Sequence, residues 1–158
     1  MTAKAPDREP LIATNRRAWR DYEILETLEA GIILVGTEIK SLRRHAASLD
    51  DSFARIDRDG VPVLYHLYIQ PYEQGNRANV EATRSRTLLL HKQQIARLAG
   101  KMARTRLLLV PLKMYFKPGF AKVELALARG KLEFEKRDTI QRRESQREMD
   151  RARRRFRE

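Results

Sequence analysis

The chain has 158 residues, of which 33 are Lys or Arg and 21 are Asp or Glu, so its formal net charge is +12. It contains no cysteine, which excludes disulfides, thiol catalysis and zinc-thiolate sites. No apolar stretch is long enough to span a bilayer and the N-terminus has no apolar core of signal-peptide type, so we expect a cytoplasmic chain without a membrane partner.

The positive charge is spread over the whole chain. Residues 131–158 carry 11 basic and seven acidic side chains, and residues 1–130 hold the remaining excess of eight positive charges. Nucleic-acid affinity comes largely from phosphate neutralisation and counterion release. We therefore favour a nucleic acid as the partner over the alternative of a merely soluble basic protein.

The first 14 residues predict a disordered leader, because prolines and scattered charges supply no core-forming pattern. Structure is expected from Asn15 onward. Alternating apolar and polar side chains over residues 22–28 predict a strand. The run Glu29-Ala30-Gly31 then predicts a turn into a second strand over residues 32–35.

Thr37 is a plausible N-cap for a short helix that reaches Arg43. A second hairpin is predicted from residues 52–57 and 61–69, and Asp59-Gly60 supplies its turn signal.

Residues 70–86 predict a long polar loop, and loops of this kind are usually functional or disordered. The clearest helix spans residues 91–102, where apolar residues recur at helical spacing. Two strands, 107–116 and 121–128, are joined by Lys117-Pro118-Gly119 and close the domain.

The order of elements indicates a mainly β fold with short helices (α+β). Six strand candidates with hairpin connections can curl into a small antiparallel barrel, and closure removes exposed sheet edges. Strands and helices do not alternate, so a doubly wound parallel sheet is disfavoured. We divide the chain into the leader, a barrel over residues 15–130 and a tail over 131–158.

The tail can form a helix but has no core of its own. Met149, Ala152 and Phe156 recur at helical spacing, but large apolar side chains are too few to offset the entropy of ordering the segment. We expect the tail to be disordered when free and helical on a polyanionic partner.

Nothing in the sequence supports an active site. His45, His66 and His91 form no metal-spaced cluster, and His91 is better explained as a helix-end or surface residue. Asp50-Asp51 resembles a carboxylate pair, but a turn before a strand explains it better. We expect no catalytic residue, metal or cofactor.

Several segments, in order and with the expected spacing, resemble the SsrA-binding protein (SmpB) family. They are Asn15-Arg16-Arg17-Ala18, Glu29-Ala30-Gly31-Ile32, the run 36–43, Asp51-Ser52-Phe53-Ala54-Arg55, the run 71–77, the run 86–92, the run 110–117 and Ala121-Lys122-Val123-Glu124. The resemblance covers nearly everything from Asn15 into the tail.

The resemblance implies a barrel of the oligonucleotide-binding (OB) type and a job in trans-translation. Such a protein would be a non-enzymatic adaptor that binds the tRNA-like domain of transfer-messenger RNA and delivers it to stalled ribosomes. No wide apolar patch in the sequence argues for a homodimer, so we expect a monomer. The tail would enter the decoding centre and the empty mRNA channel and fold there into a helix. The result would be ribosome rescue and tagging of the incomplete protein for degradation.

The resemblance also implies an RNA-contacting face on the body of the protein. Its members are Asn15, Arg16, Glu29, Lys40, Leu89 and Lys122. The cations can neutralise phosphates, and an asparagine can pair with a base edge or the backbone. Glu29 could accept from a base amino group or orient an arginine, but a salt bridge at a hairpin turn explains it equally well. Leu89 could equally be a core residue.

In the tail, the resemblance points to Lys131, Phe134, Glu135, Lys136, Arg137, Arg142 and Arg143. Two positions depart from the family pattern, because Leu132 stands where a second lysine is usual and Glu135 replaces an aspartate. Phe134 could stack on a base of the decoding centre or pack back on the barrel rim.

Two rival functions remain open at this stage. A structural ribosomal protein or RNA chaperone would explain the charge but not the ordered motifs. An RNA-processing enzyme with a basic tail would need a base or metal cluster that the sequence does not display.

Overall fold

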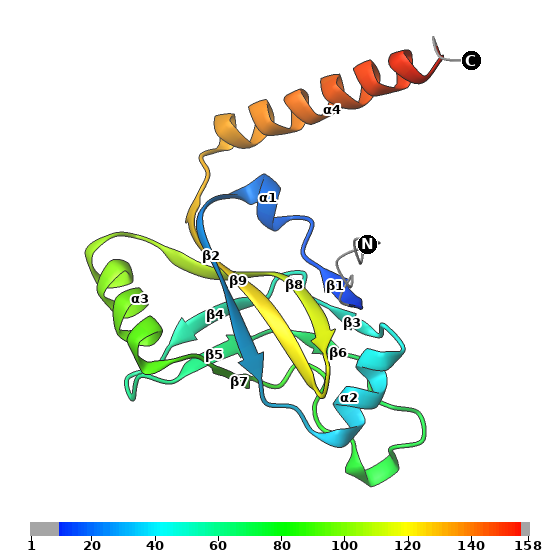
Figure 1. Ribbon diagram of the computed structural model, residues 1–158, viewed down its shortest axis with the longest axis vertical. Helices are drawn as coiled ribbons and strands as arrows, with labels where there is room; N and C mark the ends of the chain where they lie inside the picture. Colours follow the sequence, from blue (N-terminus) through cyan, green and yellow to red (C-terminus); the bar gives the residue numbers. More distant parts are fainter. Residues whose placement is uncertain (1–9, 156–158) are drawn as a thin grey trace, which may run out of the picture.

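The computed structural model describes residues 10–155, which hold nine strands, four α-helices and one 3₁₀ turn (Figure 1). The strands are β1 (Leu11–Thr14), β2 (Tyr22–Ile32), β3 (Ala47–Ser48), β4 (Phe53–Ile56), β5 (Pro62–Tyr65), β6 (Tyr68–Ile69), β7 (Arg86–Leu89), β8 (Leu108–Lys117) and β9 (Phe120–Gly130). The helical elements are α1 (Ala18–Asp21), α2 (Gly36–Arg43), η1 (Asn76–Ala78), α3 (Lys92–Arg104) and α4 (Glu133–Arg155).

Six antiparallel strands form a closed ring. Hydrogen bonding runs in the order β8-β4-β5-β7-β2-β9, and β9 returns to β8. The strand β1 pairs with β8 beyond the point where β4 joins it, and β3 and β6 form a separate two-stranded sheet. The prediction of a mainly antiparallel β fold with peripheral helices is confirmed.

The core fills the ring. Val123, Leu125 and Leu127 alternate along β9 and belong to one buried cluster, which Leu42 of α2 and Leu98 of α3 join. Burial of a side chain of this size stabilises the fold by about 1.5–3 kcal/mol relative to exposure. The ring and the two helices are therefore held together by one continuous core.

A second, smaller cluster lies under α1. Ala126 and Ala128 of β9 are buried against Ala18, together with Val110 and Leu112 of β8. Alanine side chains on the strand let the short helix approach the sheet closely. The start of the tail is fixed at this place, since the Lys131 N–H donates to the carbonyl of Asp21 at 2.9 Å.

The predicted turn at Glu29-Ala30-Gly31 is wrong, because these residues lie within β2, a single unbroken strand of 11 residues. Glu29, Ala30 and Gly31 pair with Glu124, Val123 and Lys122 of β9. The burial of Leu28, Ala30 and Ile32 shows that the apolar alternation continues past the expected turn.

Two boundaries near the N-terminus also differ from the predictions. Leu11–Thr14, assigned to the leader, form a strand on β8, whereas residues 1–9 lie outside the described part of the chain. Thr37 is not the N-cap of α2. The helix begins at Gly36, and the Val35 N–H donates to the Glu38 carboxylate at 3.1 Å.

The second predicted hairpin is confirmed as β4 and β5, but its second strand is shorter than expected. The chain leaves β5 at His66, whose φ is +62°, and residues 68–69 then pair with β3 instead. The predicted loop over 70–86 contains η1 and ends in β7, a strand that the sequence analysis did not separate from its surroundings. The helix α3 and the hairpin of β8 and β9 are confirmed.

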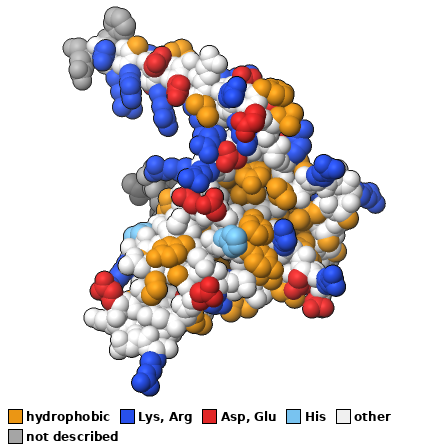
Figure 2. All heavy atoms as spheres, turned by 180° about the vertical axis from the view of Figure 1, so that it is seen from behind, with side chains coloured by type: hydrophobic (Ala, Val, Ile, Leu, Met, Phe, Trp, Pro, Cys, Tyr) orange, Lys and Arg blue, Asp and Glu red, His pale blue; other side chains and the backbone are white. Residues whose placement is uncertain are grey.

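The helix α4 projects away from the ring beside α1 (Figure 1). Its side chains are mostly exposed, and none in residues 133–155 is buried. Basic side chains are distributed along it, with carboxylates between them (Figure 2). Phe156, the last member of the predicted apolar stripe, lies outside the described residues.

Candidate nucleic-acid interface

Three of the predicted RNA-contacting residues line one hollow of about 350 Å³. Glu29 comes from β2, Leu89 from the end of β7 and Lys122 from β9. Leu89 is 56% exposed, so the alternative of a core leucine is wrong. A Cβ added to Gly31 would lie 3.1 Å from the Leu89 Cβ, so the glycine makes room for Leu89 at this place.

Glu29 is ionised and bonded within the protein. It accepts a hydrogen bond from the Tyr115 hydroxyl and another from Lys117 Nζ at 3.0 Å. These two hydrogen bonds hold the pKa of Glu29 below its usual value, although partial burial opposes them. Glu29 thus takes part in an ion pair, but in the middle of a strand and not at a hairpin turn. The predicted contact with a base stays a prediction.

Lys122 belongs to a face where lysines and carboxylates alternate across β8 and β9. Its Nζ lies 5.9 Å from the centre of the Phe120 ring. On the same hairpin, Lys113 Nζ lies 3.3 Å from Glu124 and Lys117 pairs with Glu29. These contacts restrict the rotamers of the lysines, so less side-chain entropy is lost when they bind a phosphate, but the carboxylates paired with Lys113 and Lys117 offset part of their charge.

Lys40 lies in a different cluster, on α2. Its Nζ is 5.4 Å from the centre of the Tyr72 ring, and the Arg44 guanidinium is 5.0 Å from the same centre. Cation–π contacts of this kind contribute about 0.5–1 kcal/mol at exposed sites. Two cations on one ring give the surface of α2 a second place suited to RNA phosphates.

The loop that carries Tyr72 is folded onto α2. The Asn79 side chain accepts from the Tyr72 N–H at 3.1 Å and donates to the Tyr72 carbonyl at 2.8 Å. A Cβ on Gly75 would lie 2.5 Å from the Asn79 side chain, so a larger residue here would displace the amide from its hydrogen bonds with Tyr72. The side-chain amide of Asn79 therefore holds the predicted polar loop in an ordered conformation.

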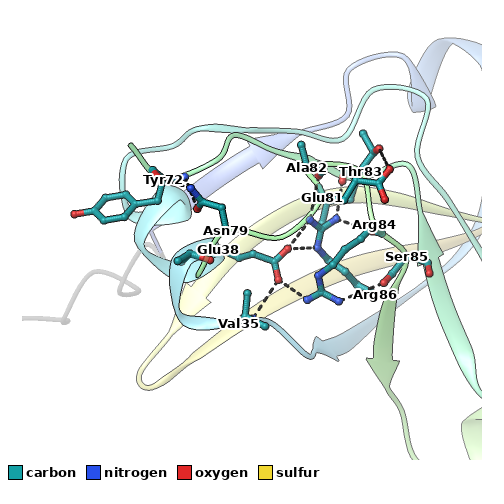
Figure 3. Close-up of polar contacts among 12 residues, drawn as sticks. Val35, Glu38, Tyr72, Asn79, Glu81, Ala82, Thr83, Arg84, Ser85 and Arg86 are labelled. Atoms are coloured by element: carbon teal, nitrogen blue, oxygen red, sulfur yellow. Dashed lines mark hydrogen bonds and ion pairs between the residues drawn. The ribbon is translucent and has the colours of Figure 1, made fainter. Parts of the chain in front are cut away.

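A buried ionic network fixes α2 to the start of β7 and the residues just before it (Figure 3). Glu38 accepts hydrogen bonds from Arg84 and from Arg86 Nε, the latter at 2.5 Å. Arg86 is fully buried and also donates to the carbonyls of Leu67 and Ala82, at 2.6 and 3.1 Å.

Burial alone would raise the pKa of Glu38. Hydrogen bonds from Arg84, the Val35 N–H and Arg86 outweigh burial, and the pKa lies below its usual value. Glu38 is therefore an anion that holds α2, and with it Lys40, in place.

Asn15 and Arg16 lie away from the hollow, at the start of α1. Asn15 is buried, donates to the Pro111 carbonyl at 3.0 Å and accepts from the Ala18 N–H at 3.3 Å. Its amide holds the entry to α1, and its direct contact with RNA stays a prediction. Arg16 is exposed in the adjoining turn.

The start of the tail is held by specific bonds. Lys131 Nζ donates to the Trp19 carbonyl at 3.3 Å and to the Thr139 hydroxyl at 3.0 Å. Glu135 accepts from the Leu132 N–H at 3.0 Å, so the residue that departs from the family pattern caps α4.

The other predicted tail residues lie along α4 with their side chains largely outward. Phe134 is 62% exposed, which argues against packing on the rim and leaves its ring accessible. Lys136 is 3.6 Å from Glu133, and Arg137, Arg142 and Arg143 are exposed. Contacts of these residues with RNA stay predictions.

The sequence analysis missed several residues that the structure places beside Lys40 on α2 or beside Lys122 on the hairpin of β8 and β9. They are Arg44, Tyr72, Lys113, Lys117 and Phe120. Tyr72, Lys113 and Lys117 stand in motifs that carried the family resemblance, and their outward positions follow the alternation of a strand or an ordered loop. The spacing of Lys40 and Arg44 on one helix face was a usable signal.

The residues considered for catalysis are in structural positions. Asp50-Asp51 form a turn before β4, and His91 is the exposed N-cap residue of α3. Within residues 10–155, no group of three or more His, Asp or Glu side chains is arranged to hold a metal ion. The helices of that same part are too short or too polar to cross a membrane.

Comparison with known proteins decides the family. The model of the SmpB protein family matches residues 12–155. The chain belongs to the SmpB family.

Curated relatives with the description SsrA-binding protein agree with this assignment. The SsrA-binding protein of Pelotomaculum thermopropionicum is 54% identical over 142 residues, which cover 90% of this chain and 92% of the relative. That of Desulforamulus reducens is 53% identical over 155 residues and 96% of both chains.

A solved structure connects the SmpB family to a ribosomal setting. Its description is "tmRNA-SmpB: a journey to the center of the bacterial ribosome". One of its chains is 57% identical to this one, has a TM-score of 0.63, and covers 76% of this chain and 84% of its own length. The fold of the SmpB body is therefore shared.

Proposed function

We propose that this protein is an RNA-binding adaptor, not an enzyme, that binds transfer-messenger RNA and acts with it on ribosomes in the cytoplasm. Membership of a family whose relatives carry the description SsrA-binding protein supports the proposal most strongly. The gathering of Glu29, Leu89 and Lys122 in one hollow supports it independently, because these residues are far apart in sequence.

The proposal divides the work between body and tail. Residues 15–130 bind the tRNA-like domain of the RNA, through the hollow and through Lys40 beside Tyr72. The tail, residues 131–158, enters the decoding centre and the empty mRNA channel of a stalled ribosome. Residues 133–155 already form α4 in the structure, but none of its side chains is buried, so the proposal is that this helix is stably populated only on the ribosome. The incomplete protein is then tagged for degradation.

A salt-series binding titration tests the proposal. The intact protein is titrated with the tRNA-like domain of transfer-messenger RNA and with an ordinary tRNA at matched ionic strength. We expect tight binding with a clear preference for the first RNA and a linear fall of log affinity with log salt. Equal, weak binding to both RNAs would contradict the adaptor and leave a basic RNA-associated protein.

Replacing Lys122 by alanine is expected to weaken binding of the tRNA-like domain about 5- to 10-fold. The substitution removes one phosphate-neutralising cation, so the slope of log affinity against log salt should fall by about one. Arg58→Ala is the matched control, since Arg58 is an exposed cation in the turn between β4 and β5. An equal loss of affinity in both variants would show that binding depends on overall charge and not on the hollow.

A further inference from the structure

A second hollow, of about 500 Å³, lies between α2 and the turn that joins β8 to β9. None of the residues that carried the predicted RNA-contacting face lines it. Its walls are mostly apolar, with Ile33, Ile39, Phe116 and Phe120 among the lining residues.

Two of these apolar side chains are unusually exposed. Phe120 is 68% exposed and Ile33 is 50% exposed. Phe120 follows Gly119, whose φ of +79° lets the tight turn place the aromatic ring at the rim. An exposed ring beside an apolar hollow marks a surface that another molecule covers.

The charges around the hollow indicate what that molecule is. Arg43 and Lys117 line it, and Lys122 Nζ lies over the ring of Phe120. Among the described residues that line the hollow there is no carboxylate. Lys117 also pairs with the nearby carboxylate of Glu29, so Arg43 and Lys122 carry the excess positive charge at the rim. An apolar floor with a cationic rim is complementary to a nucleotide, whose flat base is flanked by backbone phosphates.

Two side-chain contacts connect the hollow to the first one. Lys122 lines the hollow of Glu29 and Leu89 and contacts Phe120 of the second, while Lys117 lines the second and pairs with Glu29 of the first. A strand of RNA that occupies the first hollow is thereby directed across the turn toward α2. Lys40 and Arg44 lie on that helix and its C-terminal end.

We propose that the second hollow binds one unstacked nucleobase of the RNA held by the first hollow, with Phe120 stacking on the base and Arg43 neutralising an adjoining backbone phosphate. The inference rests on the proposed function and adds to it a base-binding subsite that is separate from the predicted contact residues. The base is one that the RNA leaves unpaired, since only an unstacked base can enter a protein hollow.

The test uses the intact protein and tRNA-like domain RNA in which 2-aminopurine replaces one unpaired base at a time. Only replacements that leave the affinity unchanged are used. We expect one position to change its fluorescence on binding, and this change to disappear in Phe120→Ala. Affinity should fall about 5- to 100-fold in Phe120→Ala and recover in Phe120→Tyr, which keeps the ring. Leu25→Ala is the control, because Leu25 is 53% exposed on β2 and lines neither hollow.

The outcomes separate this inference from the proposed function. If the wild-type protein prefers the tRNA-like domain but no position responds and Phe120→Ala binds equally well, the base-binding subsite is overturned and the adaptor stands. If the wild-type protein shows no preference between RNAs, the proposed function fails. A loss of affinity as large in Leu25→Ala as in Phe120→Ala would also overturn the subsite, because it would reflect general apolar surface.

Discussion

Replacing Arg86 by methionine is expected to lower the free energy of unfolding by about 3–5 kcal/mol, the usual cost of breaking a buried ion pair by removing one partner. Arg86 is fully buried, and its guanidinium donates hydrogen bonds to the Glu38 carboxylate (Figure 3). It also donates to the carbonyls of Leu67, Arg84 and Ala82. Methionine fills a similar volume but satisfies none of these acceptors. Urea denaturation followed by circular dichroism measures the loss.

Arg58→Met is the control for the loss of an exposed arginine. Its free energy of unfolding is expected to change by less than about 0.5 kcal/mol, since surface positions of this kind contribute little. A change below about 1 kcal/mol in Arg86→Met would mean that Arg84 and the Val35 N–H alone satisfy Glu38, and that the network does not hold α2.

The same network gives stability a defined dependence on pH. Because the folded-state pKa of Glu38 lies below the ordinary value of 4.5, its ion pairs contribute in full above that value. The contribution is lost as pH falls through the lower folded-state pKa. Thermal midpoints measured between pH 7 and pH 3 should therefore fall more steeply for the wild type than for Glu38→Gln. Parallel curves for the two proteins would contradict this account.

Truncation after Gly130 is expected to leave affinity for the tRNA-like domain within about twofold while abolishing ribosome rescue. The hollow residues lie in the ring, and α4 contacts the body through α1 and the bonds of Lys131 and Glu135. Filter binding measures the affinity, and tagging of a nascent chain on an mRNA without a stop codon measures rescue.

A thermal midpoint within a few degrees of the intact protein would show that the truncated body is folded. Phe134→Ala in the full chain is a finer variant, because this ring is exposed and its removal should leave the midpoint unchanged. Loss of RNA affinity on truncation would move the main binding surface into the tail and contradict the division of work.

The sequence predicted correctly those elements whose structure depends on residues close together in the chain. The amphipathic stripe of α3 and the turn between β8 and β9 need only neighbouring residues to be recognised. The continuation of β2 through Gly31 depends on pairing with β9, nearly a hundred residues away, and on the close approach of Leu89. The residues next to positions 29–31 do not contain that information, so the local pattern around Gly31 predicts a turn.

The residues of the candidate site were likewise only partly predictable from the sequence. The family resemblance named Glu29, Leu89 and Lys122, and the ring brings them together. Asn15 shows the limit of such a transfer, because burial and two internal hydrogen bonds give it a positioning role that residue type does not reveal. The contact of Arg44 and Tyr72 also depends on how the loop folds back on α2.

The paired strands β2 and β9 fix the distance between the hollow lined by Lys122 and the start of the tail. Lys122 lies near one end of β9, where it lines the hollow with Glu29 and Leu89, and Gly130 is the last residue of the strand, just before the tail. Eight residues separate them, which at roughly 3.3 Å per residue gives about 26 Å. Insertion of two residues in both strands would preserve the alternation of side chains but move the tail about 7 Å farther from the hollow. Under the proposed division of work, the length of one strand pair therefore sets how far from the bound RNA the tail can reach into a ribosome.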